Sequence, residues 1–270
     1  MENPAGVKRG AQIMREGLRP FDEAGEMEGK TKGRAASVIE KPARGDRVTA
    51  AYEQLRDLII WGKLAPGTRI IETDVAARLG VSRTPVRSAL QRLVQEGYIV
   101  ALDGAAQIRL MVAPLTQDDA RELFAILSEL EALAASWAAA LPLAERRKLV
   151  SELRSLNGEL ARLTRGSDLD SNGIFDLDQA FHRCFLEAGG GPRLRALHEA
   201  VKPQSARYIR LYVSVLIDQI HKSVVDHEAI AAAIEAGDAQ EAKQAVLRNW
   251  RNAGERLSHV IARFGERGIW

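Results

Sequence analysis

A chain of 270 residues has room for one large or two ordinary domains, and 46% hydrophobic residues are enough to build buried cores. The formal net charge is only +2, so binding to nucleic acid would have to depend on a local basic patch. The single cysteine excludes an intramolecular disulfide framework, and no apolar run has the length of a membrane span or a signal peptide, so we expect a cytoplasmic protein without a membrane partner. Residues 1–44 combine glycine, proline and mixed charges without a sustained period, which predicts a disordered tail.

Residues 45–113 have the pattern of a winged helix-turn-helix domain. The expected elements are a helix from about Asp46 to Trp61, a turn at 65–67, an extended piece at 69–71, a second helix from about Thr73 to Leu79, a third helix within 81–97, and two strands at 98–100 and 108–112. Gly80 ends the second helix, and Asp103-Gly104 forms the turn between the strands. A strand pair that follows a helix-turn-helix is typical of a wing.

The third helix, VSRTPVRSALQRLVQEG, carries the most informative surface of this half. Ser82 is a good N-cap and Pro85 lies in the first turn, where a missing N–H has no cost. The apolar positions Val86, Ala89, Leu90 and Leu93 share one face, and Arg83, Thr84, Arg87 and Gln91 share another. Two guanidinium groups, a hydroxyl and an amide near a helix N-terminus suit phosphates and guanine edges. In isolation, the same residues also fit an ordinary surface helix with solvated arginines.

Three short segments, in this order along the chain, resemble the winged helix of the GntR superfamily of bacterial transcription regulators: Leu64-Ala65-Pro66-Gly67, then VSRTPVRSAL, then Gly97-Tyr98-Ile99. The resemblance implies that the third helix enters the major groove of double-stranded DNA and that the wing tip reaches the minor groove. It assigns DNA contacts to Arg83, Thr84, Arg87 and Gly104. The sequence departs from the family at Thr73, where an arginine is frequent, and at the wing tip, which lacks the usual arginine.

Residues 114–265 predict an all-α bundle of about six helices, so the fold class is mostly α. Thr116 is expected to cap the first of these helices and Pro142 to separate it from the second. The expected helices are 117–140, 143–165, about 177–188, one that continues to about Val215 with a kink at Pro203, about 223–236, and 239–264.

A small set of polar residues in this half has the chemistry of metal ligands. Asp178 and His182 are four residues apart on one helix, while His227 and Asn249 lie on the last two helices. A carboxylate and two imidazoles that converge in a bundle suit Zn²⁺, Ni²⁺ or Mn²⁺. Each histidine also fits a hydrogen-bonded polar residue with no metal, and His198, His221 and His259, for which we identify no such ligand set, are interpreted in that way.

The words DQAFH (178–182), GGPRL (190–194), DHEAI (226–230) and AGD (236–238) resemble the FCD effector domain, which follows the winged helix in the FadR-type branch of this superfamily. The resemblance implies a divalent metal held by Asp178, His182, His227 and Asn249, and a small organic acid bound beside it. Asn249 replaces the usual histidine, and a neutral amide oxygen is a poorer ligand. Leu127 stands where many members have an arginine, so Arg207 and Arg210 are the candidates to bind the acid.

The sequence therefore predicts a homodimeric, ligand-responsive transcription regulator, with a repressor released by an organic acid as the main interpretation. A metal-responsive regulator is the first alternative. A metal-dependent hydrolase is the second, although no general base, nucleophile elbow or phosphate loop accompanies the metal ligands. We therefore expect no enzymatic activity.

Overall fold

The computed structural model describes residues 44–102, 108–164, 170–216 and 219–268. It divides into two compact units, Met1–Ala113 and Pro114–Trp270, which are described separately below. The predicted tail and the wing tip with Gly104 lie outside the described residues, except that Arg44 is the first residue of a helix. Among the described helices, none is both long and apolar enough to cross a membrane.

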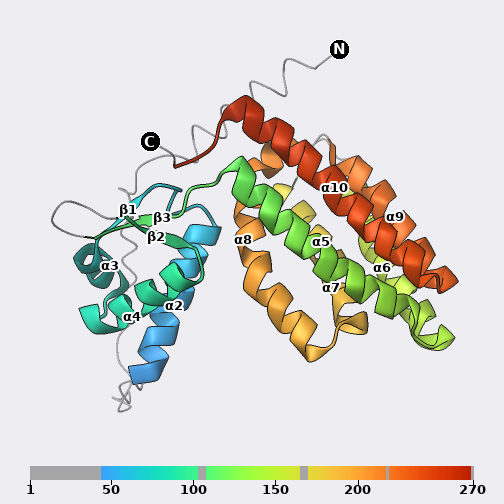
Figure 1. Ribbon diagram of the computed structural model, residues 1–270, viewed down its shortest axis with the longest axis horizontal. Helices are drawn as coiled ribbons and strands as arrows, with labels where there is room; N and C mark the ends of the chain where they lie inside the picture. The colour runs from blue at the N-terminus through green and yellow to red at the C-terminus, as the bar shows by residue number, and fades with distance from the viewer. Residues whose placement is uncertain (1–43, 103–107, 165–169, 217–218, 269–270) are drawn as a thin grey trace, which may run out of the picture. The chain divides into compact units, whose positions relative to one another are not determined.

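The first unit contains the predicted helix-turn-helix and wing (Figure 1). Its elements are α2 (Arg44–Ile60), β1 (Arg69–Ile70), α3 (Glu72–Leu79), α4 (Arg83–Gln95), β2 (Ile99–Leu102) and β3 (Arg109–Val112). The core joins Leu55 of α2 to Val86, Leu90 and Leu93 of α4, all at most 1% exposed. Burial of these side chains, at roughly 1.5–3 kcal/mol each, fixes α4 with its opposite face outward.

The turn between α3 and α4 depends on Gly80. This residue is the C-cap of α3 with φ 63°, a left-handed conformation that L side chains rarely adopt. Ser82 occupies the N-cap position of α4, but its side chain makes no capping hydrogen bond, so the expected contribution of the hydroxyl is absent. The predicted extended piece is a true strand: β1 pairs with β3, and the antiparallel sheet has the order β1-β3-β2.

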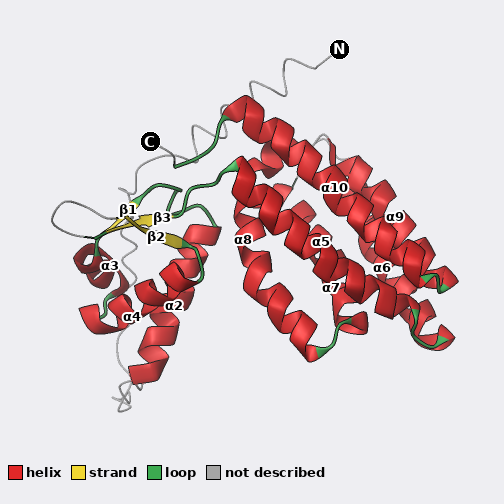
Figure 2. Ribbon diagram, in the orientation of Figure 1, coloured by secondary structure: helices red, strands yellow, loops and turns green. Residues whose placement is uncertain are grey.

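The second unit is a bundle of helices joined by short loops in its described part (Figure 2). The helices are α5 (Gln117–Ala139), α6 (Leu143–Leu163), α7 (Ser171–Gly189), α8 (Pro192–Leu216), α9 (Ile220–Ala236) and α10 (Ala239–Phe264). Side chains cap three of them, because Thr116, Asp170 and Asp238 accept hydrogen bonds from backbone amides in the first turns of α5, α7 and α10.

Helix α5 is central to this bundle, since it packs against α10, α7, α8 and α9. It lies side by side with α10 in Figure 1. One sequence expectation needs correction: helix α7 begins at Ser171 rather than near Leu177, because Asp170 provides an N-cap there. The expected helix through Pro203 is present as α8, which ends at Leu216.

Candidate functional site

The outward face of α4 presents the four side chains that the sequence assigns to DNA binding. Arg83, Thr84, Arg87 and Gln91 are exposed, whereas the residues between them that face the core are buried. The arginine side chains are 61% and 57% exposed for Arg83 and Arg87. Within the first unit, the structure therefore brings two exposed guanidinium groups together in the N-terminal half of one helix.

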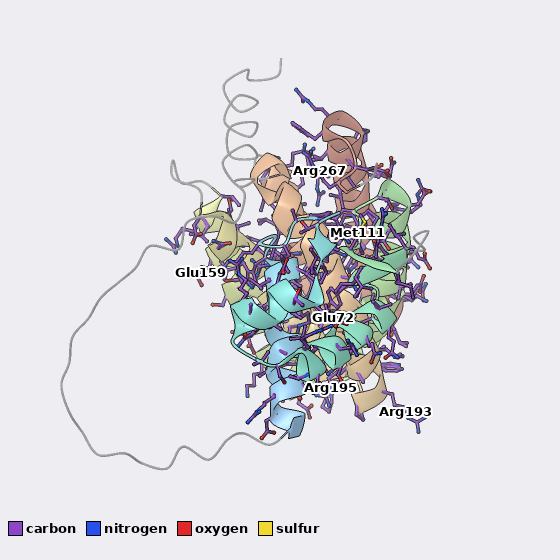
Figure 3. All side chains as sticks on the ribbon, turned by 90° about the vertical axis from the view of Figure 1, so that its left-hand side faces the viewer. Glu72, Met111, Glu159, Arg193, Arg195 and Arg267 are labelled. Atoms are coloured by element: carbon purple, nitrogen blue, oxygen red, sulfur yellow. The ribbon has the colours of Figure 1, made fainter. Side chains whose placement is uncertain are left out.

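Glu72, which is labelled in Figure 3 and lies at the start of α3, contacts both arginines. Its carboxylate accepts hydrogen bonds from Arg87 Nε at 3.0 Å and Nη2 at 2.9 Å, and Arg83 Nη2 lies 3.6 Å away. The hydrogen bond from Arg87 lowers the pKa of Glu72. A bidentate pair of this kind fixes the plane of the guanidinium group, and it occupies donors that Arg87 would otherwise offer to DNA.

In the second unit, the structure brings together Asp178, His182 and His227, whose potential ligand atoms lie within 4.8 Å of one another. His227 is fully buried, and among the described residues neither of its ring nitrogens has a hydrogen-bond partner. Its Nε2 lies 3.6 Å from Asp178 Oδ1, and its ring stacks on Phe181 with centroids 4.0 Å apart. Burial, reinforced by the neighbouring His182, lowers the pKa of His227 to about 3, so the imidazole is neutral and available as a ligand at neutral pH.

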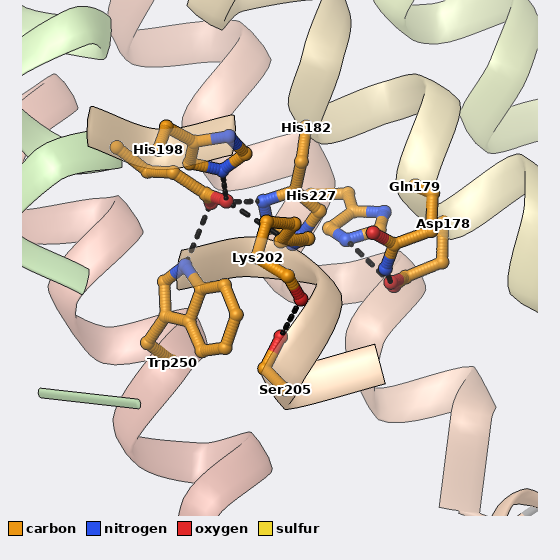
Figure 4. A network of polar contacts seen from close by, with 9 residues as sticks. Asp178, Gln179, His182, His198, Lys202, Ser205, His227 and Trp250 are labelled. Carbon is orange, nitrogen blue, oxygen red and sulfur yellow. Dashed lines mark hydrogen bonds and ion pairs between the residues drawn. The ribbon is translucent and has the colours of Figure 1, made fainter. Parts of the chain in front are cut away.

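A buried carboxylate that the sequence analysis did not identify as functional lies beside this cluster. Glu131 of α5 is 0% exposed and accepts from His182 Nδ1 at 2.6 Å, His198 Nε2 at 2.8 Å, Lys202 Nζ at 3.2 Å and Trp250 Nε1 at 2.7 Å (Figure 4). Burial alone would raise the pKa of Glu131. The charges of Lys202 and His182, with the hydrogen bonds from both histidines, outweigh burial and hold the pKa well below its ordinary range.

Glu131 thus fixes the orientation of the His182 ring through Nδ1 and leaves Nε2 for another ligand. It also gives His198 a carboxylate partner 67 residues away in the sequence. The signal in the sequence was a single acid on the face of α5 that otherwise carries Phe124 and Leu127. A charged residue at a core position is rarely fully buried unless it is paired.

A small cavity of about 70 Å³ opens next to these residues. Its lining combines the polar side chains Asp178, His182, Lys202, Ser223, Asn249 and Arg256 with apolar and aromatic ones. Neither Arg207 nor Arg210 is among the lining residues. Arg207 is buried and donates to Gln204, and Arg210 lies over the Phe175 ring, 4.0 Å from its centroid. The cationic groups that the cavity offers are those of Lys202 and Arg256, which the sequence analysis missed.

A larger groove of about 360 Å³ runs between α5 and α10, but it lacks the carboxylate and both imidazoles of the cluster. The smaller cavity is therefore the one that carries the polar side chains of the cluster. The two units together define a class of protein: a DNA-binding regulator whose helical domain holds a polar ligand cavity.

The comparisons with known proteins identify the family. The sequence profile described as "Bacterial regulatory proteins, gntR family" matches residues 47–107, and that of the FCD domain matches residues 122–252. The chain belongs to the GntR family of bacterial transcription regulators and carries an FCD domain, the ligand-binding effector domain of these proteins.

Similar proteins are named as transcription regulators, and similar solved structures share the fold. A helix-turn-helix-type transcriptional regulator from an unstable DNA locus of Streptomyces ambofaciens is 31% identical over 78% of this chain and 85% of its own length. The gluconate operon transcriptional repressor of Bacillus subtilis is 25% identical over 83% and 89%. Among solved structures, Escherichia coli McbR/YncC has a TM-score of 0.58 at 21% identity, covering 79% of this chain and 98% of that one. A GntR regulator from Rhodococcus sp. RHA1 has a TM-score of 0.58 at 25% identity, covering 78% and 97%.

Proposed function

We propose that the protein is a cytoplasmic, homodimeric repressor that leaves its operator when a small organic acid binds in the second unit. The observation that carries this proposal is the cavity beside Asp178 and His182, which has two cationic side chains, Lys202 and Arg256, at its wall. The name of the Bacillus subtilis relative, a gluconate operon repressor, supports the direction of regulation.

The size and charge of the cavity restrict the effector. A volume of about 70 Å³ lies well below the roughly 300 Å³ of an ordinary ligand pocket, which favours a small molecule. An ammonium and a guanidinium group favour a carboxylate, and the guanidinium group can bind it through two parallel hydrogen bonds. Ser223 is held by Arg256 Nη2 at 3.0 Å, so an acid that binds Arg256 would compete with this contact.

The residues present also fit a divalent metal. His227 has two buried nitrogens with no partner in the described structure, His182 is oriented by Glu131, and Asp178 supplies a carboxylate. Asp178, His182 and His227 would hold Zn²⁺, Ni²⁺ or Mn²⁺, and Asn249, which is 4% exposed in the same cavity, would contribute at most a weak amide ligand. A bound cation would supply a further binding point for a carboxylate effector.

On DNA, two copies of α4 would address the half-sites of a near-palindromic operator. Arg83 and Arg87 would read bases, and Thr84 and Gln91 would add polar contacts, with Gly104 allowing the wing backbone to approach the duplex. The acid would act by population shift, because it binds one arrangement of the bundle better than the other.

A thermal-shift series with small organic acids, with and without Zn²⁺, Ni²⁺ or Mn²⁺, tests the cavity, since a ligand of the folded state raises the melting temperature. The acid that stabilises the protein should then release it from a genomic operator fragment in a gel-shift titration. Lys202→Gln should weaken both effects, while Lys148→Gln, an exposed lysine on α6, should change neither. An acid that stabilises the protein but leaves operator binding intact would contradict the proposal.

The unpaired nitrogens of His227 favour one second candidate, a regulator for which the metal itself is the effector. Dialysis against a chelator distinguishes the acid-responsive from the metal-responsive regulator. In a metal-responsive regulator, operator affinity should change with metal content in the absence of any acid; in an acid-responsive one, it should not. A metal-dependent hydrolase would instead consume the acid, which chromatography of the incubated acid would detect.

A further inference from the structure

Helix α5 carries an apolar stripe on its exposed side, away from the buried face that holds Glu131. The stripe consists of Ile126, Leu130, Leu133 and Trp137. Ile126, Leu133 and Trp137 are 41%, 38% and 45% exposed, and Leu130 is half-buried. Large apolar side chains so exposed on one helix mark an interaction surface rather than a solvated one.

The spacing of the stripe is that of a coiled-coil seam. Its members are four, three and four residues apart, which is the alternation of a and d positions in a heptad. The same stripe is also symmetric about its own midpoint. When a second α5 packs against it in the antiparallel direction, Ile126 faces the Trp137 position and Leu130 faces the Leu133 position, and both pairs repeat across the two-fold axis.

The charges allow this pairing. Between Ile126 and Trp137 the charged residues are Glu129 and Glu131 only, and Glu131 points into the bundle. Glu129 lies 3.7 Å from Lys243 of its own chain, so its charge is balanced there. Glu129 lies beside the seam, next to Leu130, and in an antiparallel coiled coil its nearest flanking position on the partner is Ser136, next to Trp137. No like charges are therefore opposed along the seam.

We infer that this stripe of α5 is the centre of a two-fold, antiparallel interface between two copies of the chain. The inference rests on the homodimer in the proposed function and specifies which surface forms it. A 23-residue helix is about 34 Å long and about 10 Å wide, so one face of α5 offers roughly 350 Å². That is nearly half of the ~800 Å² that each partner buries in a standard interface, and neighbouring surface has to supply the rest.

Sedimentation velocity of the full chain at micromolar concentration tests the surface. The unmodified protein and Val225→Lys, a control at an apolar α9 residue that is 70% exposed, should sediment as dimers. Leu133→Lys should sediment as a monomer, with the dimer dissociation constant raised at least about a hundredfold. A dimeric Leu133→Lys protein would overturn the inference and leave the proposed dimer intact, whereas a monomeric unmodified protein would overturn both.

Cysteine cross-linking tests the direction of pairing without disturbing the fold. In a Cys184→Ser background, chains with Leu130→Cys are mixed with chains with Leu133→Cys and oxidised. The inferred register gives a disulfide-linked dimer in the mixture and not in either variant alone. Cross-linking of Leu130→Cys chains with each other would show parallel pairing, and an absence of cross-links in the mixture would exclude contact at this seam; both results would overturn the inference.

Discussion

Replacing Glu131 by glutamine should destabilise the second unit strongly. The carboxylate is fully buried and accepts from four donors, two of which, Lys202 and His182, stabilise its charge. Glutamine has one acceptor oxygen, and its NH₂ group would face other donors. Removing one partner of a buried ionic network costs about 3–5 kcal/mol, and Lys202 can turn part of its ammonium group to water because its side chain is 13% exposed. We therefore expect the free energy of unfolding to fall by about 3 kcal/mol, the lower end of this range.

Thermal unfolding followed by far-UV circular dichroism measures this loss. For a domain of this size, 1 kcal/mol corresponds to about 2–4 °C, so the melting temperature should fall by about 6–12 °C. Glu129→Gln is the matched control: the residue lies two positions away on the same helix, is 66% exposed and forms an ion pair with Lys243. Its effect should stay within about 0.5 kcal/mol. A loss below about 1 kcal/mol in Glu131→Gln would refute the idea that the network needs this charge.

The remaining predictions concern the two proposed ligand sites. Arg87→Ala should weaken specific operator binding roughly ten- to a hundredfold in a gel shift with an unchanged circular dichroism spectrum, whereas Arg92→Ala, which removes an exposed arginine from the last turn of the same helix, should change it little. Glu72→Gln removes the charged partner of Arg87, so affinity for random DNA should rise and the ratio of specific to non-specific binding should fall; an unchanged ratio would exclude a positioning role. His227→Ala should abolish the rise in melting temperature caused by Zn²⁺ or Ni²⁺, and Asn249→His should produce that rise at a lower metal concentration, because imidazole is a better ligand than an amide. Metal stabilisation that is equal in both variants would place the metal elsewhere.

Local periodicity was sufficient to predict most of the helices and the exposed face of α4. The apolar spacing of Val86, Leu90 and Leu93 alone determines which side of the helix is buried, so the outward direction of Arg83 and Arg87 follows. The predicted N-cap that the structure confirms, Thr116, accepts a hydrogen bond from an amide three residues away, so the local sequence contains the information needed to predict it.

Contacts between distant residues could not be predicted in this way. The four donors of Glu131 lie 51, 67, 71 and 119 residues away in the sequence, so no window of the chain contains the network. Strand β1 was recognised only as an extended piece because two residues have no period, and its pairing with β3 joins positions about forty residues apart. The early start of α7 did have a signal, since Ile174 and Phe175 are buried and continue the helical period backwards from Asp178.

The position of Glu131 gives a route by which ligand binding in the cavity would affect the DNA-binding unit. This one side chain joins α5 to His182 of α7, Lys202 of α8 and Trp250 of α10, and both His182 and Lys202 also line the cavity. A carboxylate effector that attracts Lys202 would compete with Glu131 for the same ammonium group, so its binding energy would be exerted directly on α5. The opposite side of α5 carries the proposed dimer stripe, and only four residues separate the end of β3 from the start of this helix. A shift of α5 would therefore act on the pairing of two copies and on the chain that leads to each wing, without requiring a separate pathway through the bundle.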